Sequence, residues 1–440
     1  MTDSSSASPH APGTPLPVRK HYALYVLFMM VCLYTVNYID RFLVAGLLDP
    51  IKQSLDVSNT FMGFLIGPAF AIFYTTLAIP IARLADRYSR IKIISIGTVV
   101  WSFFTVLSGY VTTPEAFAIA RIGVGVGEAA FLAPAFSLLS DYYPPKRRAM
   151  AFAVLNLGVY IGQIGGLIGG AAIAEMAGWR TAFYALGLPG VILGLLAFIT
   201  VREPARGCLD EANDKPEENR TFAEVIAALW QSRTYVFMSL GAALGGFAGY
   251  GFGYWGPTLF SRAFELTQTD ANTRFGVFFG LSGLFGALLM GFICDRLTVK
   301  NPRWPFILSS VGVVGSMTFM ICTSLTDNIG IATALAVPAG LLGGGWVVAL
   351  QAALQDLLPG ETRATGTSIW AFALTFTGLV GGVQFAGFMI DFLQASYGTA
   401  AIRYALSLTL LACIPSGIFI MLAGVSFADD RKALLKNLRD

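Results

Sequence analysis

Residues 80–90 read PIARLADRYSR, and residues 289–297 read LMGFICDRL. Each stretch closes an apolar run with an aspartate followed by an arginine, at Asp86 and at Asp295. Two further pairs of segments match in the same order: DYYPPKRRA at 141–149 with DLLPGETRA at 356–364, and GGLIGG at 165–170 with TGLVGG at 377–382. Three matches in one order indicate that the chain contains the same unit twice, an arrangement found in secondary transporters.

The chain carries too few charges for a water-soluble protein. Of its 440 residues, 55% are hydrophobic and 12% are charged, which is about half the charged fraction of typical soluble domains. Most of its surface must therefore face lipid. The net charge of +3 is too small to indicate a nucleic-acid partner.

The sequence also argues against an enzyme. Its two histidines, His10 and His21, lie at or before the start of the first apolar run, which excludes histidine triads and histidine-ligated metals within the spans. The five cysteines form no CxxC motif, so we expect neither a zinc site nor a disulfide framework. No GxxxxGK[ST] loop is present, so we expect no cofactor and an ion gradient as the energy source.

Twelve apolar runs are long enough to cross about 30 Å of hydrocarbon. We expect an all-α membrane protein with twelve transmembrane helices, near 22–48, 61–84, 91–111, 115–140, 149–174, 181–201, 234–261, 273–297, 304–325, 329–357, 364–391 and 400–427.

Lysine and arginine set the expected orientation. With both termini inside, 22 of the 29 basic residues fall in inner segments and two lie within spans. The outer segments then hold only five: Lys52, Arg180, Arg262, Arg274 and Arg403. Because positively charged loops stay on the cytoplasmic side, we expect a multi-pass protein of the bacterial inner (plasma) membrane with both termini in the cytoplasm.

The longest polar stretch divides the chain into two six-helix halves. We expect a disordered cytoplasmic tail at 1–20, a first half at 21–201, a cytoplasmic linker at 202–233, a second half at 234–427 and a tail at 428–440. The end of the linker, TFAEVIAALWQSRTY, and the final RKALLKNLRD each fit two structures. One is a short helix on the inner membrane face, and the other is a solvated segment.

The loop after the second span, Asp86-Arg87-Tyr88-Ser89-Arg90, resembles the signature loop of the major facilitator superfamily, with Ala82 in place of its usual glycine. The resemblance covers residues 20 to 427. Three further segments resemble the Spinster branch of that superfamily: NYIDR at 37–41, RIGVGVGEA at 121–129 and REPARG at 202–207. This resemblance implies two pseudo-symmetric six-helix halves, a functional monomer and a substrate site between the halves.

Four ionisable residues lie inside apolar spans. Asp40 and Arg41 fall in the first span, and Arg121 and Glu128 fall in the fourth. Because charge is costly in the membrane, such residues usually face a water-filled cavity or a partner. We expect Asp40 and Glu128 to bind the coupled protons, and Arg41 and Arg121 to be their charge partners or to hold an anionic substrate head. The alternative is a static ion-pair cluster that fixes the two helices.

Charged residues at the inner ends of the spans form a second group. Their positions suggest a cytoplasmic gate whose charge pairs break when the transporter changes conformation; the alternative is that they only fix orientation. The gate residues of the first half are Asp86, Arg87, Arg90, Asp141 and Arg148, and their counterparts are Asp295, Arg296, Asp356 and Arg363.

Aromatic and amide side chains in the spans are candidates for substrate contact. The spans of the second half contain no central charged residue, so we expect its cavity wall to be apolar and aromatic. The candidates are Tyr34, Asn37, Tyr38, Tyr74, Tyr160, Gln163, Phe247, Tyr250, Tyr254, Trp255, Gln351 and Trp370.

A cavity that is charged on one wall and apolar on the other suits an amphiphile. We therefore expect a proton-coupled secondary transporter of a lipid-like amphiphile, with protons and membrane lipids as its other partners. The Spinster resemblance implies lysophospholipids or phosphorylated sphingoid bases. The first alternative is a small organic-anion or multidrug transporter of the same fold, and the second is a non-transporting membrane enzyme or scaffold.

Overall fold

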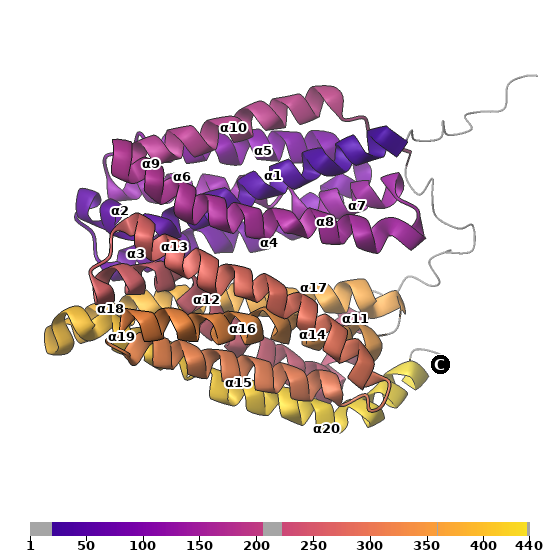
Figure 1. Ribbon diagram of the computed structural model, residues 1–440. Helices are drawn as coiled ribbons and strands as arrows, with labels where there is room; N and C mark the ends of the chain where they lie inside the picture. The colour runs from indigo at the N-terminus through magenta and orange to yellow at the C-terminus, as the bar shows by residue number, and fades with distance from the viewer. Residues whose placement is uncertain (1–19, 206–221, 359, 438–440) are drawn as a thin grey trace, which may run out of the picture.

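A computed structural model describes residues 20–205, 222–358 and 360–437 of the chain. Within these residues the chain forms only helices and their connections, and the helices of the first half lie in one layer above those of the second half (Figure 1). The described chain begins and ends at the same end of the bundle, at Lys20 and Asn437. We call this end the terminal end and the opposite end the distal end.

The first half, residues 20–205, consists of six spans. Several of them are divided into two or more helical segments. The segments are α1 (Lys20–Gly46), α2 (Leu48–Leu55), α3 (Asn59–Ile66), α4 (Pro68–Arg87), α5 (Arg90–Ser108), α6 (Pro114–Glu128), α7 (Leu132–Tyr142), α8 (Pro145–Ile164), η1 (Gly165–Gly169), α9 (Gly170–Ala177) and α10 (Trp179–Thr200).

The second half, residues 222–437, repeats this arrangement after one short helix. Its segments are α11 (Phe222–Gln231), α12 (Arg233–Phe264), α13 (Gln268–Arg274), η2 (Phe275–Leu281), α14 (Ser282–Thr298), α15 (Trp304–Leu325), α16 (Ile329–Leu357), α17 (Gly360–Phe376), η3 (Thr377–Val383), α18 (Gln384–Tyr397), η4 (Gly398–Ala400), α19 (Ala401–Leu410) and α20 (Cys413–Asn437).

Polar residues at the ends of the spans explain where several helices begin. The side chains of Ser58, Ser89 and Thr113 accept hydrogen bonds from backbone N–H groups in the first turns of α3, α5 and α6. These N–H groups have no partner inside the helix, so a capping oxygen stabilises the helix start.

Eleven stretches of described helix are long and apolar enough to cross a membrane, and the last of them, Thr365–Leu434, has 70 residues. At 1.5 Å per residue it would be roughly 105 Å long if straight, several times the thickness of the hydrocarbon. The chain turns back at Gly398, whose φ of 53° lies in the left-handed region, and α18 packs against α19. This stretch therefore forms two spans, and the predicted fold class is confirmed.

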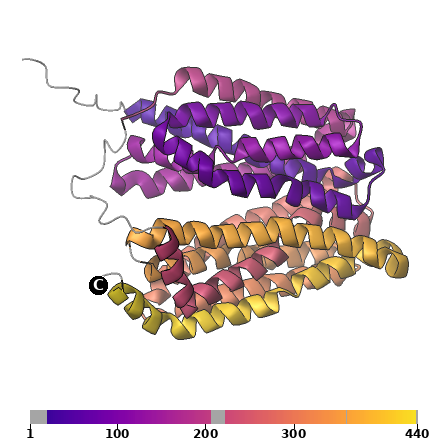
Figure 2. The same ribbon diagram turned by 180° about the vertical axis from the view of Figure 1, so that it is seen from behind.

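The end of the predicted linker forms a helix. Figure 2 shows that α11 runs crosswise to the long helices near the terminal end, and it packs on α12 and α17. Trp230 at its end is 70% exposed. Residues 1–19, 206–221 and 438–440 lie outside the described part of the chain, so the predicted N-terminal tail and half of the predicted linker stay predictions. The tail expected at 428–440 is helical as far as Asn437, where α20 ends.

Four of the spans at the boundary between the halves have an irregular backbone midway along their length. Gly67 separates α3 from α4 with φ −89° and ψ −96°, and the π-helical segments η1, η2 and η3 interrupt three other spans. These spans carry the contacts between the halves, for example α4 with η3 and α8 with η2. Such irregular segments often mark hinges or functional sites in helices.

Hydrogen bonds join the two halves at the distal end. Within the described residues, the hydrogen bonds between the two halves connect α1, α2, α3 and α9 of the first half with α12, α13 and α18 of the second half. The segments α2, α3, α9, α13 and α18 lie at the distal side of the bundle, and α1 and α12 take part through their distal ends, at Gly46 and Arg262 (Figure 1). The described part of the bundle is therefore closed at its distal end.

Candidate functional site

The four ionisable residues predicted inside the spans lie close together in the first half. Asp40 and Arg41 lie on α1, and Arg121 and Glu128 lie on α6. The guanidinium of Arg41 donates from Nε to Glu128 Oε2 over 2.6 Å, and this ion pair is buried. A charge-assisted hydrogen bond of this length is among the stronger ones in proteins. The pair therefore ties α1 to α6 within the membrane-spanning part of the bundle.

Aromatic rings surround the guanidinium of Arg41. Its Cζ atom lies 4.4 Å from the ring centroid of Tyr74, 5.0 Å from that of Phe70 and 5.1 Å from that of Tyr38. Arginine gains cation–π attraction from such faces, more so where water is excluded. Phe70 also lies 5.5 Å from the guanidinium of Arg121. The ring of Phe70 therefore contacts both arginines, and each arginine keeps nitrogen donors for further partners.

Asp40 lies deeper than Arg41. Its side chain has no solvent-accessible area, and Glu128 is 1% exposed. Three polar groups interact electrostatically with the carboxyl group of Asp40: the carboxyl of Glu128, the guanidinium of Arg121 and the hydroxyl of Thr105 on α5. The expectation that Asp40 and Glu128 face a water-filled chamber is wrong for this conformation, because helices of the first half pack around both carboxyl groups. Any proton exchange with water needs a rearrangement of α1, α5 or α6.

A series of aromatic rings connects the charged cluster to the second half. Tyr34 stacks on Phe131 and contacts Tyr38, and Tyr38 stacks on Phe42 of the same helix. Phe42 then stacks on Tyr254 of α12, with 5.4 Å between centroids and 6° between planes.

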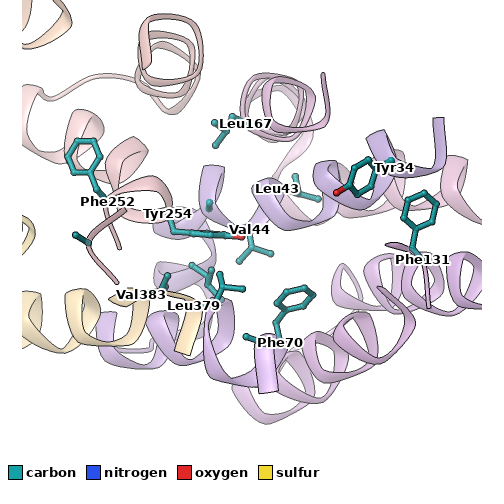
Figure 3. Close-up of a cluster of buried hydrophobic side chains, with 14 of the residues drawn as sticks. Tyr34, Leu43, Val44, Phe70, Phe131, Leu167, Phe252, Tyr254, Leu379 and Val383 are labelled. Atoms are coloured by element: carbon teal, nitrogen blue, oxygen red, sulfur yellow. The ribbon is translucent and has the colours of Figure 1, made fainter. Parts of the chain in front are cut away.

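Figure 3 shows Tyr254 pointing toward Val44 of α1, with Leu379 of η3 below it. Tyr250 lies one helical turn from Tyr254, with 6.4 Å between the ring centroids. The predicted aromatic wall of the second half is thus present next to Arg41, in the form of Tyr250 and Tyr254.

Sequence reasoning missed three of these rings, those of Phe42, Phe70 and Phe131. Phe42 follows Tyr38 by four residues, and Phe70 precedes Tyr74 by four. Residues four apart lie on the same face of a helix, so this spacing was the signal that could have identified Phe42 and Phe70.

The remaining substrate candidates are more scattered. Asn37 is buried beside Glu128, and Gln163 lies against Gly280 at the boundary between the halves. Phe247 packs on Phe385. Tyr160 is half-buried and Gln351 is exposed.

Two predicted tryptophans are buried in helix packing. Trp255 has no exposed area, and its Nε1 donates to the backbone oxygen of Val383 over 3.0 Å. Trp370 is 2% exposed. In this conformation neither presents a surface to a substrate, so their assignment as substrate contacts is not supported here. Both are large side chains whose burial satisfies packing between helices of the second half.

The charged residues at the terminal end form a network within the first half. Arg90 donates to Asp141 over 2.5 Å, to Glu203 over 2.6 Å, and to the backbone oxygen of Ser137. The second oxygen of Glu203 accepts from the hydroxyl of Ser89 and the backbone N–H of Ile91. Glu203, which sequence reasoning did not single out, thus caps the start of α5. Its signal was its place in the REPARG segment, directly after the sixth span.

The other predicted gate residues show no shared arrangement. Arg148 donates from Nε to the backbone oxygens of Ser140 and Tyr143. Asp86, Arg87, Asp295 and Asp356 are exposed. The guanidinium of Arg296 lies 4.0 Å from the Phe292 ring centroid, and the side chain of Arg363 lies outside the described residues. The gate role of the whole group stays a prediction.

The Glu203 network gives a testable stability effect. Glu203→Gln removes the negative charge that pairs with Arg90, whose side chain is 2% exposed. We expect the free energy of unfolding to fall by about 1–3 kcal/mol because a buried donor loses a charged acceptor. Thermal unfolding of the purified protein in detergent should show a lower midpoint. Glu115→Gln, an exposed change at the start of α6, is the matched control. Equal midpoints for the two variants would contradict this assignment.

No group of three or more His, Cys, Asp and Glu side chains in the described part of the chain is arranged to hold a metal ion. The central cluster offers two guanidinium groups, of Arg41 and Arg121, and two carboxyl groups, of Asp40 and Glu128. Such a site can bind and release protons and can bind an anion.

Comparison with known proteins gives consistent relatives. The family model described as Major Facilitator Superfamily matches residues 30–382. The chain is 28% identical to an MFS-type efflux pump of Mycolicibacterium smegmatis, over 86% of this chain and 87% of that protein. It is 27% identical to the sphingosine-1-phosphate transporter SPNS2 of Danio rerio, over 92% of this chain and 84% of that protein.

A solved structure shows the same fold. The crystal structure of a bacterial homologue of the human lysosomal transporter Spinster, in an inward-facing and unoccupied conformation, superposes with a TM-score of 0.85 at 27% identity. The superposition covers 93% of this chain and 98% of that one. The chain is thus related to Spinster proteins, and it belongs to the major facilitator superfamily, a family of membrane transporters and not of enzymes.

Proposed function

We propose that this protein is a proton-coupled secondary transporter that carries an amphiphilic, lipid-like substrate by alternating access. The observation that carries the proposal is the buried Arg41–Glu128 ion pair, which lies beside Asp40 and under aromatic rings that extend to Tyr254 of the second half. A charged cluster on one half that meets an aromatic surface of the other is suited to a head group and an apolar tail.

Competition for Arg41 explains how protons and substrate are coupled. While Glu128 is ionised, its hydrogen bond occupies Arg41. A proton on Glu128 would release the guanidinium, which then needs another anion because an unpaired buried charge is costly. An anionic head group of the substrate meets that need. Asp40, beside Glu128 and Arg121, is the second proton site in this scheme, and Arg121 either holds this cluster together or contacts the head group.

The relatives support the substrate class. SPNS2 is named as a transporter of sphingosine-1-phosphate, a single-chain amphiphile with a phosphate head. In this chain Tyr34, Tyr38, Tyr74, Tyr250 and Tyr254 are the side chains that we assign to the substrate. We infer a lysophospholipid or a phosphorylated sphingoid base because arginine binds phosphate well and aromatic rings accept an alkyl chain.

The distribution of basic residues assigns the sides of the membrane. We place the terminal end, with its excess of lysine and arginine, in the cytoplasm of a bacterium. The closed distal end then makes this conformation inward-facing, as the related Spinster homologue is. The single chain contains both halves of the fold, so we expect it to function as a monomer. The exposed charges at the terminal end, Asp86 and Arg87 among them, remain our candidates for a cytoplasmic gate.

A second candidate function is the export of small organic anions or drugs. The relative named as an MFS-type efflux pump favours it, since it is as similar to this chain as SPNS2 is. An efflux pump that accepts many compounds would use the aromatic rings and would not require a phosphate head.

A thermal-shift screen separates the two candidates. Ligands that bind the folded state stabilise it and so raise its unfolding midpoint. At a ligand concentration 100 times the dissociation constant, the stabilisation is about 2.7 kcal/mol. We expect single-chain phosphate amphiphiles to stabilise the purified protein more than short organic anions or hydrophobic cations do. Stabilisation by the cations or short anions instead would favour the efflux function.

The same screen tests proton linkage. Measured at about pH 5 and about pH 8, the shift should be larger at the lower pH, where Glu128 releases Arg41. Phosphate itself gains charge over this range because its second pKa is about 6. An alkyl sulfate, whose charge is constant, is therefore the control ligand. Equal shifts for the sulfate at both pH values would exclude linkage through Glu128.

A further inference from the structure

A chain of polar contacts at the distal end alternates between the two halves. Asp49 of α2 accepts from Nη2 of Arg262 of α12 over 2.5 Å and from its Nε over 3.0 Å. Arg262 also donates to the side-chain oxygen of Asn59 of α3 over 2.8 Å. The amide nitrogen of Asn59 then donates to Asp391 of α18 over 2.6 Å. Each step crosses from one half to the other, and we call these four residues the distal latch.

Asp391 also binds the start of α3. Its Oδ1 accepts from the backbone N–H of Asn59 over 3.1 Å, and its Oδ2 accepts from the backbone N–H and the hydroxyl of Thr60, both over 2.6 Å. Ser58 takes the next N–H, that of Phe61. The free N–H groups of the first turn, together with the helix dipole, attract a carboxylate. Here that carboxylate comes from the opposite half of the protein.

Glycines below the latch bring the backbones of the two halves into contact. A Cβ atom on Gly63 would lie 3.1 Å from the backbone oxygen of Val383, and one on Gly67 would overlap the backbone oxygen of Leu379. On the other side, a Cβ atom on Gly387 would lie 2.5 Å from the backbone oxygen of Asn59. Closure of the distal end thus depends on small residues at this seam, and the seam places Asp391 within reach of α3.

We propose that Asp391 is the positioning residue that holds the distal end closed, by capping α3 of the other half through the distal latch. Opening of the distal end separates α3 from α18, so all four hydrogen bonds of Asp391 must break together. Asp391 does not contact Asp40 or Arg41, so it sets the balance between the two conformations without binding proton or substrate. The proposal goes beyond the proposed function, since it holds for any substrate.

Two pairs of spin labels on the full-length protein in nanodiscs measure this balance. The five native cysteines are first replaced by serine. A distal pair, Gln53→Cys with Gln394→Cys, and a terminal pair, Lys92→Cys with Val299→Cys, use exposed positions, one in each half. Pulsed electron spin resonance then gives the distance distribution of each pair. A change of conformation lengthens one distance and shortens the other.

Asp391→Ala should shift the protein toward the distal-open conformation. We expect the ratio of open to closed molecules to rise about tenfold, which corresponds to about 1.4 kcal/mol. Asp391→Asn, which keeps one acceptor oxygen, should give a smaller shift. Asp270→Ala, an exposed change on distal helix α13, should give none.

Gly67→Ala tests the close backbone contact between the halves independently of the hydrogen bonds of Asp391. The added methyl group would push α4 away from η3, so it should open the distal end without removing a hydrogen bond. Gly253→Ala is its matched control, because a Cβ atom on Gly253 meets nothing within 4 Å.

Two results would overturn the proposal. One is an unchanged distal distance in Asp391→Ala. The other is a longer distal distance with an unchanged terminal distance, since that pattern reports local loosening of α3 and not a change of conformation. Neither result depends on proton coupling or on the identity of the substrate, so this test and the tests of the proposed function fail separately.

Discussion

Asp40→Asn is expected to abolish accumulation of substrate driven by a pH gradient while leaving exchange of substrate across the membrane intact. Asparagine has nearly the shape of a protonated aspartate and cannot release a proton. Asp40 is fully buried, so an ionised carboxylate there is costly and its protonation is tied to the conformation. A variant fixed in the neutral form can still change conformation with substrate bound. It cannot extract work from the gradient.

Proteoliposomes with purified protein distinguish the two activities. One coupled proton and a difference of about two pH units support about 100-fold accumulation, because each unit is worth about 1.36 kcal/mol. This accumulation should disappear in Asp40→Asn, whereas counterflow of labelled substrate should stay near the wild-type rate. Asp270→Asn, at an exposed distal position, should behave as wild type in both assays. An unchanged response to pH in Asp40→Asn would remove this residue from the mechanism.

Substitutions of Arg41 and Glu128 should affect stability and binding in different ways. Arg41→Met and Glu128→Gln each leave one buried charge without its partner, and we expect each to cost about 3–5 kcal/mol of stability. The double variant should recover much of this loss, because no unpaired charge remains. Thermal unfolding of the four proteins without substrate measures this cycle.

The effects of these variants on binding of an anionic amphiphile should differ from their effects on stability. Both variants without Arg41 should lose binding, since the proposed partner of the head group is absent. Glu128→Gln should bind the amphiphile at least as tightly as wild type, and its ligand-induced thermal shift should be larger, because the ligand supplies the missing anion. If Glu128→Gln bound no ligand while Arg41→Met did, the pair would be a structural tie between α1 and α6 and not a binding site.

Hydrophobic runs were sufficient to predict the spans. The runs expected at 304–325 and 329–357 coincide with α15 and α16. Length and apolarity decide where a chain crosses a membrane, and both are local properties of the sequence. The π-helical segments and the break at Gly67 were not predictable in this way, because they arise where one half packs against the other.

The charged part of the site was predictable, because charged residues are energetically costly in a membrane and stand out within apolar runs of the sequence. Charged residues in apolar runs identified Asp40, Arg41, Arg121 and Glu128, and the structure brings all four into one cluster. Their burial was not predictable, because the sequence does not say which conformation the helices adopt. The contact of Asn59 with Asp391 was also missed. These residues are 332 positions apart and lie at span ends, where polar residues are ordinary.

The Arg90 network has a consequence for how the protein is made. All partners of Arg90 described above belong to the first half, and the last of them, Glu203, directly follows the sixth span. During translation, these ion pairs can therefore form as soon as residue 205 has left the ribosome. At about 5–20 residues per second, the first half then has many seconds to assemble in the bilayer before its partner is complete. The carboxylates of Asp141 and Glu203 pair with the buried cation of Arg90 at the terminal end, so the first half needs no residue of the second half to neutralise this charge.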